Sequence, residues 1–148
     1  MTRPGTVLGR APTQYRRDTD VIPTLVFGLV AGLVGPALAL DVPSGQPVEL
    51  VEVLVEQQAD GDWVRFRFIA PHIAREGGTI TYAEAEPDFA HLCESFAVPY
   101  IAQYELTADV VVISLADRAV EFGQADPEAT QFFEAFRLED GACIWEEF

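Results

Sequence analysis

The two histidines and two cysteines are the residues of this 148-residue chain that could perform metal or thiol chemistry. His91 and Cys93 form a His-x-Cys motif, and His72 could complete a soft-metal site for copper or zinc. However, residues two positions apart on a helix point to different faces, and no methionine follows Met1. We therefore predict no bound metal and no cofactor. If a metal does bind, His72 and His91 are the weak candidates for its ligands.

Cys93 and Cys143 suit a structural disulfide better than redox catalysis. Thiol-disulfide enzymes carry a Cys-x-x-Cys motif with one exposed sulfur, whereas these cysteines lie 50 positions apart. The apolar run near the N-terminus predicts export into an oxidising compartment, where disulfides form. We predict a Cys93–Cys143 bond, which would contribute about 4 kcal/mol by closing a loop of about 50 residues.

Carboxylates are the most abundant reactive groups, and they keep an enzymatic alternative open. A hydrolase that uses paired carboxylates needs two of them close enough for their pKa values to separate, which spacing alone cannot show. Several acids stand in or near the predicted first helix and at the end of the chain: Glu84, Glu86, Asp88, Glu146 and Glu147. Some aromatic residues could line a ligand groove, although such residues more often belong to a core: Trp63, Tyr82, Tyr100, Tyr104 and Trp145.

The charge of the chain disfavours nucleic acids and lipid headgroups as partners. Its net charge is −15, with 24 acidic residues against nine arginines and no lysine. Residues 40–148 alone carry 22 acidic residues and five arginines, a net charge of −17. Such a surface repels phosphates over a Debye length of about 8 to 10 Å. The ten phenylalanines nevertheless predict a folded core rather than disorder.

The uncharged run over residues 21–39 predicts the location of the protein. It follows Arg16 and Arg17 and ends in an Ala-Leu-Ala pattern typical of a signal-peptidase site. We predict a signal peptide over residues 1–39 and a periplasmic protein. The alternative is an uncleaved inner-membrane anchor that leaves the domain in the periplasm. Residues 40–47 would then form a linker, and residues 48–148 a single domain.

A β-hairpin is the first element that would position these groups, with strands over 48–57 and 63–70. Asp60 and Gly61 form a strong hairpin-turn signal. With this turn Val55 would face Phe66, and apolar pairs would fall on one face. The opposite face then presents Leu54, Arg65, Arg67 and Ile69, which we predict to be an interaction face. The alternative is that both arginines simply pair with Glu56 and Glu52.

Apolar stripes at helical spacing predict two helices, over about 84–98 and 127–138. The first carries Phe89 and Cys93 and begins either at Pro87 or one turn earlier, from a Thr81–Glu84 capping box. Pro99 is expected to end it. The second helix would follow an Asp126-Pro127 cap and carry three phenylalanines: Phe132, Phe133 and Phe136.

The remaining strands complete the predicted fold. The β-branched run 109–115 predicts a central strand, Val120 and Phe122 a strand beside it, and residues 142–148 a last strand. The resulting fold class is α+β, with a mostly antiparallel sheet and both helices packed on one face.

Residues 91–102 and 112–148 resemble a small family of exported alphaproteobacterial proteins that contain a domain of unknown function. The resemblance covers most of residues 42–148. It rests on the signal peptide, the Leu92-Cys93 pair and the Gly-Ala-Cys-Ile-Trp segment that ends at Trp145. It implies export and a fixed cysteine pair, and it implies no activity.

Together these features predict a non-enzymatic binding or protein-interaction domain of the periplasm. We expect an unknown protein partner in the envelope, with the domain accessory to an envelope complex. One alternative is a small envelope hydrolase that uses paired carboxylates. A second alternative is a metal or ligand carrier.

Overall fold

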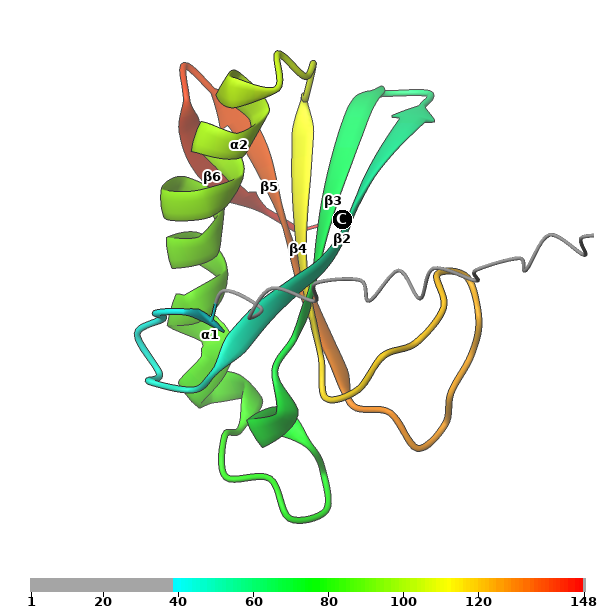
Figure 1. Ribbon diagram of the computed structural model, residues 1–148. Coiled ribbons are helices and arrows are strands. Elements are labelled where there is room, and N and C mark those ends of the chain that lie inside the picture. The colour runs from blue at the N-terminus through cyan, green and yellow to red at the C-terminus, as the bar shows by residue number, and fades with distance from the viewer. Residues whose placement is uncertain (1–38, 148) are drawn as a thin grey trace, which may run out of the picture. The chain divides into compact units, whose positions relative to one another are not determined.

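Six strands form one sheet, in which they lie side by side in chain order (Figure 1). The computed structural model describes residues 39–147. The strands are β1 (Ala39–Leu40), β2 (Val48–Gln58), β3 (Gly61–Ile69), β4 (Val110–Ala116), β5 (Gln131–Glu139) and β6 (Ala142–Glu146). Strands β3 and β4 are parallel, because a helical crossover joins them, and the other neighbouring strands in this sheet are antiparallel. The sheet is therefore mixed rather than simply antiparallel.

A single helical run covers one face of the sheet (Figure 1). It comprises α1 (Tyr82–Leu92), a π-helical segment (Cys93–Ala97) and α2 (Val98–Gln103). Thr81 caps α1, because its hydroxyl accepts the N–H of Glu84 while the Glu84 carboxylate accepts the N–H of Thr81. The helix therefore begins from the capping box rather than at Pro87.

Pro99 does not end the helix, contrary to the prediction. In the π-helical segment the Val98 N–H donates to the carbonyl of Cys93, five residues back. Pro99 follows directly in the first turn of α2, so this wider π-helical turn accommodates a residue that has no N–H to donate. The run continues to Gln103.

The core lies between the helical run and the sheet. Strand β3 contributes Val64, Phe66 and Phe68, and β4 contributes Ile113 and Leu115. The predicted helical stripe is buried against them, with Phe89, Leu92, Cys93 and Ala97. All of β4 is buried, because Val111, Ile113 and Leu115 pack in the main core on one face, while Val110 and Val112 on the other face form a second buried cluster with Ala135 and Trp63. The prediction of a central strand there is correct.

The predicted hairpin exists, but its register is shifted by two residues. Gln58 pairs with Gly61, so Ala59 and Asp60 form the turn. Val55 therefore faces Val64 instead of Phe66. Two residues is the full side-chain repeat of a strand, so from Glu52 onward the shift leaves the side chains on their predicted faces. The irregularity between Leu50 and Glu52 reverses the faces before it, so Val48 is buried and Val51 is exposed.

Gly61 begins β3 instead of forming the turn, and its lack of a side chain explains the register. Its φ is +135°, and a Cβ atom there would lie 2.4 Å from Oδ2 of Asp109. That oxygen accepts the backbone N–H of Asp62 at 2.8 Å. The glycine thus allows the start of β4 to approach the hairpin closely.

The second predicted helix, over 127–138, is wrong. Residues 131–139 form β5, which pairs with β4 and β6. Phe132 and Phe136 contact the core, while Phe133 points from the opposite face. Asp126 accepts the N–H of Glu128, so the apparent helix cap is a local turn. Val120 and Phe122 likewise lie in the loop 117–130 rather than in a strand.

Residues 40–47 are packed against the domain, which corrects the predicted linker. Leu40 pairs with Val48 in the sheet, and Val42 is buried. The fully buried carboxylate of Asp88 in α1 accepts hydrogen bonds from the N–H and hydroxyl of Ser44 and from the side chain of Gln46. A buried carboxylate needs such donors, so this cluster fixes the segment to the helix.

The predicted signal peptide or anchor lies outside the described residues, apart from Ala39. Among residues 39–147, the structure contains no helix that is long and apolar enough to cross a membrane.

Candidate functional site

An apolar groove lies between α1 and the β5–β6 edge of the sheet. Its volume is about 430 Å³. The lining residues come from three elements: Glu86, Pro87, Phe89 and Ala90 from α1, Glu134 and Phe136 from β5, and Trp145 from β6. A groove of this size falls within the range of sites that hold a small molecule or a large side chain.

Strand alternation places the two β-strand walls of the groove. Phe136 pairs directly with Trp145, so both side chains project toward the helical side of the sheet. Phe136 is buried in the core, whereas Trp145 is 57% exposed. The indole therefore forms an accessible wall above a packed floor.

Glu134 places a carboxylate at the rim of this groove. Its Oε2 accepts the indole N–H of Trp145 at 2.6 Å, and its Oε1 accepts the hydroxyl of Tyr82. Tyr82 is itself held against Phe132, with ring centroids 5.2 Å apart. The two hydrogen bonds fix the position of the carboxylate without neutralising its charge.

The five arginines of the described residues have partners elsewhere, so the charge of the groove is uncompensated. Four of them form ion pairs: Arg65 with Glu56, Arg67 with Glu52, Arg118 with Asp117 and Arg137 with Glu146. Arg75 donates to backbone carbonyls. Neither Glu86 nor Glu134 forms an ion pair within residues 39–147. A ligand that carries a positive charge is thus best suited to this groove.

The disulfide holds the groove together. Cys93 directly follows α1, and Cys143 lies on β6 two residues before Trp145. Their sulfurs are bonded at 2.06 Å, with Cα atoms 6.3 Å apart. The predicted cysteine pair is confirmed, and it ties the helical run to the edge strand that carries the indole.

The predicted interaction face lies on the other side of the sheet. Leu54 pairs with Arg65, and Arg67 forms a 2.6 Å ion pair with Glu52. Both guanidiniums lie over the ring of Phe122, at 5.4 and 5.7 Å from its centroid. Ile69 is half-buried at the end of β3. The loop 117–130 thus covers much of this face, and the Arg67 side chain is only 12% exposed.

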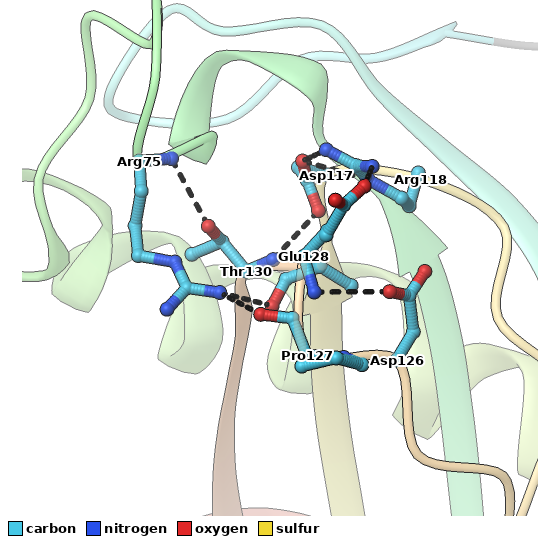
Figure 2. A network of polar contacts seen from close by, with 8 residues as sticks. Arg75, Asp117, Arg118, Asp126, Pro127, Glu128 and Thr130 are labelled. Atoms are coloured by element: carbon cyan, nitrogen blue, oxygen red, sulfur yellow. Dashed lines mark hydrogen bonds and ion pairs between the residues drawn. The ribbon is translucent and has the colours of Figure 1, made fainter.

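Arg75 anchors this loop to the segment after β3 (Figure 2). Its backbone N–H donates to the hydroxyl of Thr130 at 3.0 Å. Its guanidinium donates to the carbonyls of Pro127 and Ala129 at 2.7 and 3.0 Å. Because these contacts engage the arginine within its own chain, we assign it a structural role.

Asp117 holds the other end of the loop (Figure 2). It accepts the N–H of Thr130 at 2.7 Å and pairs with Arg118 at 3.0 Å. Burial alone would raise the pKa of Asp117, but the hydrogen bonds from Arg118 and Thr130 outweigh burial and lower the pKa overall. Arg118 and Arg75 also line a second pocket together with Glu76 and Glu128, so its charges are mixed.

The two histidines are not brought together with the cysteines into a metal site. His72 is exposed in the short helix Pro71–Ile73, and His91 is exposed near the end of α1. Within residues 39–147 no group of three or more metal-ligating side chains is present. Cys93 is committed to its disulfide.

Sequence reasoning named part of the groove and missed the rest. The sequence predicts Glu86 and Trp145 of the groove, and Tyr82 beside it, as carboxylate or aromatic candidates, but it predicts a helix for Glu134 and Phe136. The signal that could have found Glu134 is the alternation of residues 132, 134, 136 and 138, which share one face of a strand.

The chain belongs to a family of unknown function (DUF6497), which it matches over residues 27–148. No curated protein matches the chain. No solved structure matches it either. The resemblance to a domain of unknown function is therefore confirmed, and the function has to be inferred from the groove itself.

Proposed function

We propose that this domain is a non-enzymatic protein-interaction module of the periplasm. In this proposal the groove between α1, β5 and β6 holds an apolar side chain of a positively charged polypeptide. The observation that carries the proposal is Glu134, a carboxylate fixed by Tyr82 and Trp145 beside an exposed indole and without an arginine partner in the described chain. Aromatic side chains at the centre of a surface are typical anchors of protein interfaces.

The shape and composition of the groove support a polypeptide ligand. Pro87, Phe89, Phe136 and Trp145 supply apolar area, and Glu86 and Glu134 supply charge at its margin. An aliphatic side chain would be buried against the former, while a neighbouring lysine or arginine would meet the latter. Export is supported by the disulfide, since such bonds persist in oxidising compartments.

The proposal can be tested by NMR with a capped synthetic peptide that alternates lysine and leucine. We expect it to shift the indole N–H resonance of Trp145, whereas a peptide that alternates glutamate and leucine should not. Trp145→Ala should weaken binding at least tenfold, because it removes the main apolar wall. Glu134→Gln should weaken it about three- to tenfold, because it removes the fixed charge.

A matched control is Glu121→Gln, which removes one carboxylate from the exposed loop on the opposite face of the sheet. It should leave the affinity within about twofold, since an exposed distant charge contributes little. Equal effects of Glu121→Gln and Glu134→Gln, or no shift of the Trp145 indole, would contradict the proposal.

One observation favours the hydrolase alternative. Glu86 and Glu134 line the same groove, and a glycoside hydrolase places two carboxyl groups about 5 to 10 Å apart. Hydrolysis of chromogenic glycosides that is abolished by both Glu86→Gln and Glu134→Gln would establish this activity. If the protein hydrolyses no glycoside but still binds the peptide, the hydrolase alternative is wrong and the interaction module is supported.

A further inference from the structure

Strand β6 is an edge with an unused hydrogen-bonding side. It is the last strand of the sheet, and it pairs with β5 from Ala142 to Glu146 without a register shift. Within residues 39–147 no strand pairs with its outer side. An edge of this kind presents backbone N–H and carbonyl groups to any extended chain that approaches it.

Apolar side chains flank this edge on both faces of the sheet. Trp145 projects to the helical side, and Ile144, 45% exposed, projects to the other side. On that second side β5 adds Phe133, which is 64% exposed. Lysine, proline and bulges normally protect an edge from pairing, and β6 has none of them.

The charge around β6 indicates which chain could pair with it. Glu86 and Glu134 line the groove, and Glu139, Asp140 and Glu147 surround the two ends of the strand. A second copy of this domain would bring the same carboxylates face to face, which is destabilising. A partner rich in lysine or arginine would meet opposite charges instead.

We infer that β6 is extended by a strand of a different protein, an extended segment that alternates basic and apolar residues. This inference rests on the proposed function and adds to it the mode of binding. A strand added about 4.8 Å beyond β6 would place every second side chain on the helical side, next to the groove and Trp145. Backbone hydrogen bonds would then supply affinity, and the groove would select the apolar residue.

The test uses the same alternating lysine–leucine peptide and two N-methylated forms of it. In a strand, the N–H groups of every second residue point to the same neighbour. Methylating the leucine nitrogens therefore blocks one side of the peptide, and methylating the lysine nitrogens blocks the other. We expect one methylated peptide to lose affinity at least tenfold and the other to bind within about twofold of the parent.

The outcomes distinguish a failure of strand pairing at β6 from a failure of binding in the groove. If both methylated peptides bind like the parent and still shift the Trp145 indole, strand addition is wrong while the proposed function stands. If the two methylated peptides lose affinity equally, the peptide does not pair through one side only, and strand addition to β6 is again wrong. If the parent peptide does not bind, both proposals fail. Sedimentation of the protein alone should show a monomer, and a dimer protected at the β6 amides would overturn the choice of a basic partner.

Discussion

The two edges of the sheet differ in how they are built. Opposite β6, β1 covers only Val48 and Glu49, so most of the 11-residue β2 is also an edge. Its pairing with β3 is interrupted by a register shift between Leu50 and Glu52. The β6 edge has only five residues and a regular register. Although β2 exposes Val51 and Val55, each of them is followed directly by a glutamate, Glu52 or Glu56. Shape and charge thus discourage pairing at β2, whereas β6 leaves its backbone and an indole accessible.

The two edges also differ in what fixes them to the helical run. On the β2 side, β1 and residues 42–46 are held by hydrogen bonds to the buried Asp88. On the β6 side, a covalent bond joins Cys93 to Cys143. The edge that is open to a partner is therefore the one with the stronger attachment, which preorganises it for binding.

Removal of the disulfide should have the largest effect, and it should weaken the attachment of β6 to the helical run. We expect Cys93→Ala with Cys143→Ala to lower the free energy of unfolding by about 4 kcal/mol, because the loop of about 50 residues is no longer closed. Urea unfolding measures the loss. Hydrogen exchange should accelerate at β6 amides more than at β2 amides, and the wild type in reductant should behave like the variant. Equal acceleration at both edges would contradict this account.

Asp88→Asn should have an intermediate effect at the opposite edge. The amide nitrogen would face the donors of Ser44 and Gln46, so buried donors would lose their acceptor. We expect a loss of about 1 to 3 kcal/mol in urea unfolding and faster exchange at the start of β2. Glu86→Gln on the exposed side of the same helix is the control and should change stability by less than about 0.5 kcal/mol. Faster exchange at β6 instead of β2 would show that the carboxylate does not hold the β1 side.

Lowering the pH should have the smallest effect of the three changes, and this effect should again appear at β6. The hydrogen bond from Arg137 lowers the pKa of Glu146 below its ordinary value. A group whose pKa is lowered by folding stabilises the native state above its unfolded pKa, and this contribution disappears as the pH falls through the lowered value. We therefore expect the protection of the β6 amides, measured relative to their intrinsic exchange rate at each pH, to decrease slightly below about pH 4. Arg137→Met should abolish this pH dependence, and an unchanged dependence in that variant would assign it to another group.

Sequence patterns predicted the faces of the elements better than their registers. The alternation in β3 identified Val64, Phe66 and Phe68 as core residues, and the helical stripe identified Phe89 and Cys93. The hairpin register was wrong because a shift of two residues leaves the faces from Glu52 onward unchanged, so alternation does not detect the shift. What fixes it is the approach of Asp109 to Gly61, a contact between residues far apart in the chain.

The candidate site was predictable only in part, for a similar reason. Phe132, Phe133 and Phe136 fit a helical spacing, but the same residues also fit a strand with apolar groups on both faces. Pairing with the buried β4 decides between the two, and it puts Glu134 on the groove side. The Asp126-Pro127 signal was a real turn that caps no helix. Tyr82 and Trp145 could be named from sequence, whereas their shared carboxylate partner could not.

The Cys93–Cys143 bond also makes the second half of the domain a covalent ring. This ring contains β4, β5 and the exposed loop 117–130. A protease that nicks that loop would leave two fragments that still migrate as one molecule until a reductant is added. The groove would thus stay attached after a backbone cut on the far side of the sheet.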